Sequence, residues 1–360
     1  MNKQRLLTAQ KIICLLIIAA GITAFINKKE VEPVKGLKDY YKKYFPVGAA
    51  VTPRSLTGAD SLLIVQQFNS LTAENVMKMG PIHPEENRWV WEPADSIVNF
   101  AMNHGMKMRG HTLCWHNQAP RWIFKDSAGN NVTKEVLLKR LKDHITAVVT
   151  RYKGKVYAWD VVNEVIADDS ATYFRNSLWY QICGEDFVAK AFEYAHEADP
   201  KAQLFYNDYN TEQPVKREKI YKMVKKLLDA KVPVTGVGLQ GHWNIYDPLK
   251  TELKASIEKF ASLGLNVQVT ELDISVYGPR NRAGADTTAG FTPEREQMQI
   301  DQYKTVFDVL RQHKKQVNGI TFWNVSDRRS WLDGRGRKNY PLLFDQQNNP
   351  KKAYWEVVKF

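Results

Sequence analysis

The chain has 360 residues, and its content of 44% hydrophobic and 25% charged residues is ordinary for a globular protein with one large core. The formal net charge is +12, but no basic run is interleaved with aromatic residues in the manner of a nucleic-acid-binding surface. The composition therefore excludes a low-complexity chain and predicts no nucleic-acid partner, while an aromatic share of 11% is generous enough to line a cleft for sugars or bases.

The first 29 residues have the pattern of a targeting segment. Lys3, Arg5 and Lys11 precede an apolar stretch at residues 12–26, and two lysines follow it. Because about 20 apolar residues are needed to span a bilayer, this stretch is short for a membrane helix and fits a signal peptide. We therefore expect export to the periplasm or the medium, with an uncleaved membrane anchor as the alternative, and one folded domain over residues 30–360.

Short apolar runs then alternate with amphipathic helical patterns. The runs lie at residues 47–51, 68–72, 107–113, 156–163, 203–207, 235–239, 265–270 and 319–323, and helical patterns at residues 93–103, 134–151, 186–196, 214–230, 248–263, 293–313 and 351–358. A strand followed by a helix, repeated eight times, predicts an α/β fold with a single (β/α)8 TIM barrel.

The helix after the sixth run carries clear local signals. Asp247 is placed to cap its start, Pro248 suits its first turn, and Gly264 lies just beyond its end. Leu253, Ile257 and Phe260 recur every three or four residues, which predicts one apolar stripe to pack on the barrel.

Polar and aromatic residues collect where the predicted strands end. In a parallel barrel the carboxyl ends of all strands open at one mouth, where sites on this fold are built. The candidates are Glu74, Asn75, Lys78, His111, Trp115, Asn163, Glu164, Tyr209, Gln240, His242, Glu271, Asp273, Trp323 and Trp331. Each alone could be a helix cap, an ion pair or a core residue, but together they predict a functional site.

Histidine and cysteine spacing does not favour a metal. His111 and His116 are five residues apart on one strand end, and no third ligand of matching register is evident. Cys114 and Cys183 form neither a metal-binding spacing nor a disulfide framework, so we expect them to be buried thiols. We predict no metal and no cofactor.

Two carboxylates dominate this mouth. Glu164 follows a buried apolar run, where a charge is costly unless the run opens onto a site, and Glu271 ends the seventh predicted strand. One acid and one base or nucleophile, surrounded by amides and aromatic rings, are the groups needed to hydrolyse a glycosidic bond.

Several segments resemble one enzyme family. They are Glu74-Asn75 with Lys78, Arg109-Gly110-His111-Thr112-Leu113 with Trp115-His116, Trp159-Asp160-Val161-Val162-Asn163-Glu164, Gln240-Gly241-His242, Thr270-Glu271-Leu272-Asp273, and Ser326-Asp327 with Ser330-Trp331. Together, from about residue 47 to the end, they resemble the family 10 glycoside hydrolases, the endo-1,4-β-xylanases.

The resemblance implies a retaining double displacement on xylan. Glu164 would be the general acid/base and Glu271 the nucleophile, with carboxyl groups roughly 5 to 5.5 Å apart. Asn163 would bind the sugar 2-hydroxyl, and His242, between Glu271 and Asp273, would orient the nucleophile. The glycone-side pocket would consist of Glu74, Asn75, Lys78, His111, Trp115, Gln240, Trp323 and Trp331, with Tyr209 on the aglycone side.

Strand geometry adds a structural expectation. Regular alternation would send Asn163 and Glu164 to opposite faces, so the strand must bulge or twist at its end for both to reach a substrate.

Some positions depart from the family pattern or leave specificity open. Asn324 stands where the family usually has glycine, and Cys114 replaces an aliphatic residue without an expected effect. Residues 278–290 and the basic segment 328–338 are candidates for tuned specificity, with Arg335 and Arg337 as hypothetical contacts for acidic xylan branches. A β-1,4-glucanase and a non-catalytic carbohydrate-binding barrel are the alternatives, and we expect a monomer.

Overall fold

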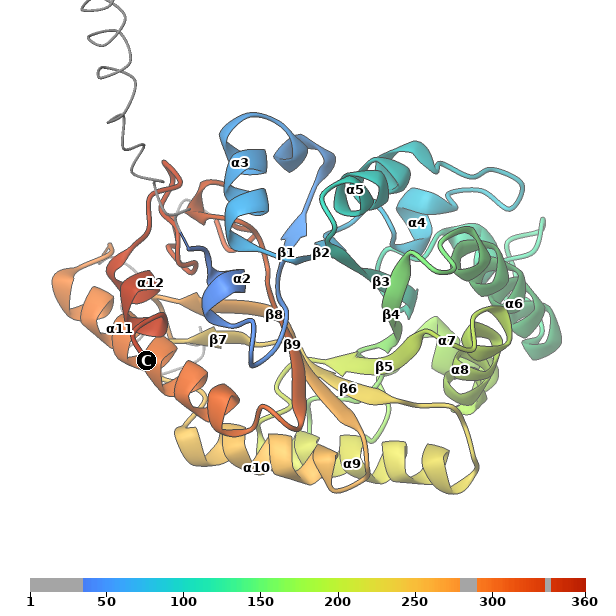
Figure 1. Cartoon of the computed structure of the whole chain (residues 1–360). Coiled ribbons are helices and arrows are strands. Elements are labelled where there is room, and N and C mark those ends of the chain that lie inside the picture. Colours follow the sequence, from blue (N-terminus) through green and yellow to red (C-terminus); the bar gives the residue numbers. More distant parts are fainter. Residues whose placement is uncertain (1–34, 279–289, 334–337) are drawn as a thin grey trace, which may run out of the picture. The chain divides into compact units, whose positions relative to one another are not determined.

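The computed structural model describes residues 35–278, 290–333 and 338–360. Nine strands in this part of the chain form one sheet, and all but β7 close a parallel barrel because β6 pairs with β8 (Figure 1). The strands are β1 (Val47–Val51), β2 (Ser70–Ala73), β3 (Lys107–Trp115), β4 (Val156–Asn163), β5 (Gln203–Asp208), β6 (Gly236–Leu239), β7 (His242–Asn244), β8 (Asn266–Ser275) and β9 (Val317–Phe322). The predicted TIM barrel is therefore confirmed.

The helices surround the barrel (Figure 1). They are α2 (Leu37–Tyr40), α3 (Gly58–Gln67), α4 (Met79–Ile82), α5 (Glu92–Asn103), α6 (Lys134–Arg151), α7 (Leu178–Cys183), α8 (Asp186–Ala198), α9 (Pro214–Asp229), α10 (Lys250–Ala261), α11 (Pro293–Gln312) and α12 (Lys352–Val357). None of the helices in the described part of the chain is long and apolar enough to cross a membrane.

The start of α10 differs from the prediction. The helix begins at Lys250 with Leu249 at its N-cap, whereas Asp247 lies in a turn in which its backbone N–H donates to the Oδ1 of Asn244, 3.2 Å away. The helix ends at Ala261, two residues before the predicted end, and Gly264 follows with a φ of +77°. The predicted apolar stripe of this helix is buried.

Most strands extend as predicted, with differences at their ends. β1 and β4 match their predicted bounds, but β8 runs on to Ser275 and pairs there with the short strand β7, which the sequence did not predict. This added pairing places His242 opposite Asp273. Cys114 and Cys183 are buried free thiols, as expected.

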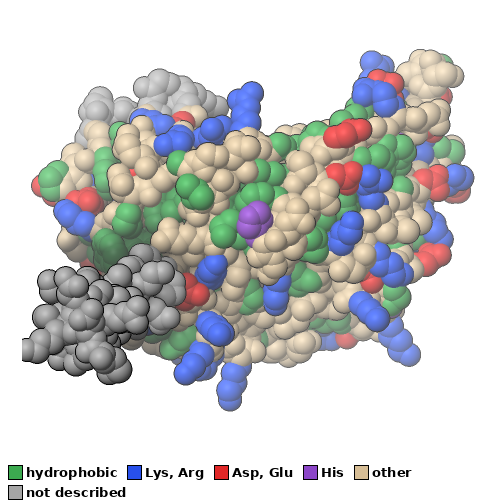
Figure 2. Space-filling view, turned by 45° about the horizontal axis from the view of Figure 1, so that its top comes forward, with side chains coloured by type: hydrophobic (Ala, Val, Ile, Leu, Met, Phe, Trp, Pro, Cys, Tyr) green, Lys and Arg blue, Asp and Glu red, His purple; other side chains and the backbone are tan. Residues whose placement is uncertain are grey.

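The charged surface matches the composition. On the face shown in Figure 2, lysine and arginine side chains are scattered among other side chains and do not form one continuous stripe. This face therefore gives no support to a polyanion-binding surface.

Candidate active site

Glu164 lies at an irregular strand end. β4 shifts register against β5 between Asp160 and Val162, and Glu164, the first residue after the strand, has a φ of +59°. A positive φ is uncommon for a residue with a side chain, and here it lets Asn163 and Glu164 both reach the amide of Gln240. The predicted irregularity is thus present.

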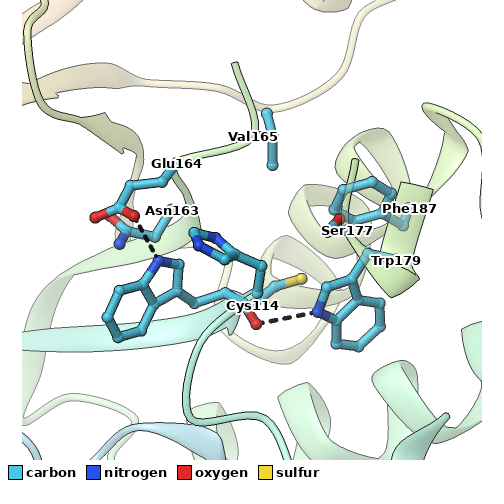
Figure 3. A pocket seen from close by; sticks show the side chains of 9 residues that line it. Cys114, Asn163, Glu164, Val165, Ser177, Trp179 and Phe187 are labelled. Carbon is cyan, nitrogen blue, oxygen red and sulfur yellow. Dashed lines mark hydrogen bonds between the residues drawn. The ribbon is translucent and has the colours of Figure 1, made fainter. Parts of the chain in front are cut away.

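Both oxygens of the Glu164 carboxylate have a fixed donor. The indole Nε1 of Trp115 donates to Oε2 at 2.8 Å, and Nε2 of Gln240 donates to Oε1 at 2.8 Å. Figure 3 shows the carboxylate of Glu164 hydrogen-bonded to the neighbouring indole. The group is held in one orientation, as a proton donor to a bound substrate must be.

A small pocket lies behind this carboxylate (Figure 3). Its walls include His116, Val165, Ser177, Trp179 and Phe187. Trp179 donates its indole N–H to the backbone carbonyl of Trp115, 3.0 Å away. This contact fixes the backbone that carries one of the two donors to Glu164.

Glu271, on β8, is buried within a different set of partners. Nδ2 of Asn207 donates to its Oε1 at 2.8 Å, Nε2 of His242 donates to its Oε2 at 3.1 Å, and His111 lies 3.9 Å from Oε1. Burial by itself would raise the pKa of Glu271, but His111 and His242 outweigh it and lower the pKa below its ordinary value. The carboxylate is thereby kept ionised, as a nucleophile requires.

His242 joins Glu271 to a second carboxylate. Its Nδ1 donates to Oδ2 of Asp273 at 2.9 Å, and the indole of Trp331 donates to the same oxygen at 2.8 Å. Despite burial, the two carboxylates raise the pKa of His242 to about 10. The imidazole is therefore a charged double donor, and the predicted placement between Glu271 and Asp273 is confirmed.

A chain of amides connects the two carboxylates. Asn207 donates its Nδ2 to Oδ1 of Asn163 at 2.8 Å as well as to Glu271, and Asn163 in turn lies 3.4 Å from the amide nitrogen of Gln240. The hydroxyl of Thr270 donates to the oxygen of Asn207 at 2.6 Å, which fixes the orientation of this amide. Glu164 and Glu271 thus belong to one rigid polar network.

Asn207 was not among the predicted site residues. It stands beside Asn163 in the β4–β5 register, so the signal that could have identified it was an amide at the same height on the neighbouring strand.

Lys78 lies on the predicted glycone side. Its ammonium donates to Oδ1 of Asn75 at 2.9 Å and lies 4.8 Å from the ring centre of Trp115 and 6.0 Å from that of Trp323. Burial lowers the pKa of Lys78, and three carboxylates oppose that shift: Glu271, Glu74 and Glu164. One cation therefore interacts with both central carboxylates.

Aromatic rings complete this side of the site. Trp323 is nearly buried, with its ring centre 5.2 Å from that of His111 and 6.1 Å from that of His242, whereas Trp331 is half exposed. Flat apolar faces beside amides and charges suit a pyranose ring, which has apolar faces and a polar rim.

A buried ion pair between Arg109 and Asp160 lies next to His111. Arg109 makes two hydrogen bonds to the carboxylate of Asp160, at 2.7 and 3.0 Å, and Nδ1 of His111 donates to Asp160 at 2.9 Å. The carboxylate of Asp160 thereby orients the imidazole of His111. In the described residues no group of three or more His, Cys, Asp or Glu residues could hold a metal ion.

Tyr209 follows β5 and lies on the predicted aglycone side. Its hydroxyl accepts from Arg175 at 2.6 Å and donates to Asp168. The ammonium of Lys216 lies 3.6 Å from its ring centre. Arg175, Asp168 and Lys216 were not predicted, because loop and helix residues that support a side chain from outside leave no pattern at a strand end.

The specificity segments are only partly described. Arg328 and Arg329 pair with Asp60, and Lys338 pairs with Asp333, so these cations are engaged within the fold. Residues 279–289, Arg335 and Arg337 lie outside the described residues.

The chain resembles known proteins over most of its length. It matches the family described as Glycosyl hydrolase family 10 over residues 36–360. It is 50% identical to a β-1,4-xylanase of Dictyoglomus thermophilum over 355 residues, which cover 97% of this chain and 98% of the relative. It is also 47% identical to an endo-1,4-β-xylanase of Geobacillus stearothermophilus over 329 residues, covering 90% of this chain and 98% of that relative.

Solved structures agree. A crystal structure of a xylanase from Paenibacillus barcinonensis, complexed with a conduramine derivative, has a TM-score of 0.87 to this chain at 45% identity and covers 91% of this chain and 99% of that one.

Proposed function

The chain belongs to glycosyl hydrolase family 10, and from this premise we infer that it hydrolyses internal β-1,4 linkages of xylan with retention of configuration. Members of the family carry out this reaction by double displacement, which uses one carboxylate as nucleophile and a second as acid and then base. The observation that carries the assignment to residues is the different environment of the two carboxylates, Glu271 and Glu164.

In the first step Glu271 attacks the anomeric carbon while Glu164 protonates the departing glycosidic oxygen. The bond to the leaving chain breaks and a covalent glycosyl ester forms on Glu271. In the second step Glu164, now a carboxylate, removes a proton from water, whose oxygen attacks the anomeric carbon and releases Glu271. Two inversions give net retention.

The surrounding groups have matching roles in this proposal. Asn163, held by Asn207, would donate to the sugar 2-hydroxyl as the oxocarbenium-like transition state forms. His242 holds Glu271 ionised and oriented. Glu74, Asn75, Lys78, His111, Trp115, Gln240, Trp323 and Trp331 would bind the glycone sugars, and Tyr209 the first aglycone sugar.

The test uses linear xylan with product analysis for the wild type and two isosteric variants. Glu164→Gln should reduce hydrolysis roughly 10²- to 10⁴-fold, the usual contribution of general acid–base catalysis, and Glu271→Gln should abolish formation of the glycosyl ester. Full activity in either variant would overturn the mechanism. The β-1,4-glucanase alternative is not favoured, and a binding protein without activity would not need both carboxylates.

Export and subunit state are also proposals. The cationic and apolar pattern of residues 1–29 supports cleavage and export, since xylan is an extracellular polymer too large to enter a cell. N-terminal sequencing of the protein recovered from a producing cell would show an uncleaved Met1 if this proposal is wrong.

We also propose that the protein is a monomer. A mass near 41.4 kDa or slightly below by light scattering would agree with a monomer.

A further inference from the structure

Arg175 contacts two functional parts of the site with one guanidinium. It lies in the segment between β4 and α7, where its Nε donates to the backbone carbonyl of Glu164 at 2.9 Å and one terminal nitrogen donates to the hydroxyl of Tyr209 at 2.6 Å. The planar guanidinium fixes the relative direction of these two bonds. Arg175 thus bridges the proton donor and the aromatic residue on the aglycone side.

The segment that carries Arg175 is itself held in place. The backbone N–H of Arg175 donates to the carbonyl of Val165 at 2.7 Å, and Ile166 and Phe174 form an antiparallel bridge. Arg175 therefore returns to the end of β4 on a short two-stranded turn rather than on a free loop.

Glu164 needs support in its backbone as well as its side chain. Its φ of +59° is a conformation that residues with a side chain adopt infrequently. The N–H of Glu164 donates to the carbonyl of Asn207 at 3.0 Å. The next peptide is held at both ends, because its carbonyl, that of Glu164, accepts from Arg175 and its N–H, that of Val165, donates to the hydroxyl of Tyr206 at 3.2 Å. Loss of Arg175 would leave this peptide held at its N–H alone, so the carbonyl of Glu164 could shift and displace the carboxylate.

Tyr209 is fixed by the same group of charges. Asp168, Arg175, Tyr209 and Lys216 form a cluster that we call the aglycone clamp. Within it Lys216, whose side chain is 3% exposed, lies 2.7 Å from a carboxylate oxygen of Asp168 and under the ring of Tyr209. Lys216 also pairs with Asp208 at 2.8 Å. The clamp combines residues from the segment after β4, the end of β5 and helix α9, so the hydroxyl of Tyr209 cannot move away without losing its hydrogen bonds to Arg175 and Asp168.

We propose that Arg175 is a positioning residue that aligns a leaving sugar stacked on Tyr209 with the proton donor Glu164. This inference rests on the proposed function and adds a coupling between the aglycone side and acid catalysis. Proton donation is efficient only when the donor lies within hydrogen-bond reach of the departing oxygen. A misplacement of about 1 Å can cost roughly 100-fold in rate.

The proposal predicts a dependence on the leaving group. A phenyl leaving group needs protonation, whereas 2,4-dinitrophenolate departs without it. Arg175→Ala should therefore lower kcat/KM for phenyl β-xylobioside roughly ten- to 100-fold and change kcat/KM for the 2,4-dinitrophenyl substrate less than about threefold, because kcat/KM reports the first, bond-breaking step. Equal losses on both substrates, or no loss on either, would overturn the proposal.

Arg140→Ala is the matched control. Arg140 also bonds backbone carbonyls, those of Trp122 and Lys125, and a carboxylate, that of Glu86, but it lies on α6 outside the site. Its loss should lower the melting temperature without changing the leaving-group dependence. The same dependence in Arg140→Ala as in Arg175→Ala would mean that general destabilisation, not positioning, causes the effect.

Two further variants keep the test decisive. Arg175→Lys retains the charge but cannot make both bonds in fixed directions, so it should show the same selective loss even if Arg175→Ala fails to fold. On xylopentaose the loss in the double variant Arg175→Ala/Tyr209→Phe should be smaller than the product of the two single losses, and a loss equal to that product would contradict the coupling.

The wild type and Glu164→Gln are measured alongside. An inactive wild type refutes the proposed function, whereas a selective loss in Glu164→Gln but not in the Arg175 variants refutes only the role of Arg175.

Discussion

At the scale of single residues, His242 determines how the nucleophile responds to pH. It lies between Glu271 and Asp273, and their charges outweigh desolvation and raise its pKa to about 10. It therefore stays an imidazolium across the range in which the enzyme would act. A positive charge 3.1 Å from Glu271 favours the ionised carboxylate, which is why the pKa of Glu271 is lowered.

Replacing His242 should move the acid limb of activity. In the wild type the nucleophile is ionised at pH values below the ordinary range of a glutamate, so kcat/KM should fall only when the pH drops below that range. His242→Gln removes the charge, raises the pKa of Glu271 and should shift the acid limb to higher pH. The measurement is kcat/KM against pH with 2,4-dinitrophenyl β-xylobioside, which needs no proton from Glu164. His196→Gln, an exposed histidine on α8, should leave the limb in place; an unmoved limb in His242→Gln would contradict the role assigned to the imidazolium.

Asn324 is a second residue-scale feature, since it combines a φ of +128° with a buried side chain. Backbone strain of this kind costs about 1 to 3 kcal/mol, and a glycine costs about 0.4 to 1 kcal/mol through the entropy of the unfolded chain. Because the relief of strain outweighs this entropic cost, Asn324→Gly should raise the free energy of unfolding by about 1 kcal/mol. Asn210→Gly is the control: its φ of +54° lies in the left-handed region that asparagine tolerates, so only the entropic cost of glycine remains and the free energy of unfolding should not rise. A loss of stability in Asn324→Gly, measured by denaturant unfolding, would show that the side chain stabilises the fold.

At the scale of elements, helices and strands with a periodic apolar pattern were predicted better than features that depend on contacts between segments. The bounds of β4 and α6 follow directly from apolar patterns and a capping threonine, Thr133, so they were predictable. The start of α10 was not, because Asp247 bonds to Asn244 in a turn instead of capping the helix. The strand β7 was missed because three residues are too few to show a period.

The candidate site divides in the same way. Side chains at strand ends, such as Glu271 and Gln240, were recognisable because the barrel brings all strand ends to one mouth. Arg175 and Lys216 were not, since they reach the site from a loop and a helix, and their partners depend on the tertiary fold. Asn207 falls between the two cases: its strand was predicted, but its contact with both Asn163 and Glu271 depends on the register of β4, β5 and β8.

The close packing of β5 against β6 allows the position of Asn207 to be tested by substitutions on β6. A Cβ added at Gly238 on β6 would lie 2.2 Å from Oδ1 of Asn207 and 2.9 Å from Cγ2 of Thr270. Because three hydrogen bonds hold Asn207, it cannot simply swing away, and Gly238→Ala should lower kcat on xylan roughly tenfold or more through misplaced groups. Gly236→Ala, where the new Cβ would meet the ring of Phe205 at 2.2 Å, should instead cost stability and leave kcat of the folded enzyme nearly unchanged. Equal kcat in both variants would contradict the role of Asn207.

At the scale of the whole molecule, a pair of buried histidines links acidity to the stability of the fold. Nε2 of His83 contacts the carbonyl of Glu86 at 3.1 Å, so this nitrogen carries the proton and Nδ1 of His83 is an acceptor. Nδ1 of His144, on α6, lies 3.2 Å from it and must therefore donate, which leaves Nε2 of His144 buried without a partner. A proton added to Nε2 of His144 would find no hydrogen-bond acceptor, and a proton added to Nδ1 of His83 would break the hydrogen bond between the two rings. Burial lowers the pKa of His144 to about 3.

This pair should make the fold less stable in mild acid. In the unfolded chain a histidine binds a proton below a pH of about 6.5, whereas folded His144 does not until about pH 3. Between these values the unfolded state binds more protons, so the stability contributed by neutral His144 is present above about pH 6.5 and is lost progressively as the pH falls.

His144→Asn keeps an amide donor for His83 but does not titrate. The slope of unfolding free energy against pH between 6 and 4 should therefore be smaller than in the wild type by up to about 1.4 kcal/mol per pH unit. Urea unfolding at several pH values measures the slope, and other titrating groups cancel because both proteins share them. His196→Asn, at an exposed position, should keep the wild-type slope, and an unchanged slope in His144→Asn would show that His144 titrates alike in the folded and unfolded chains.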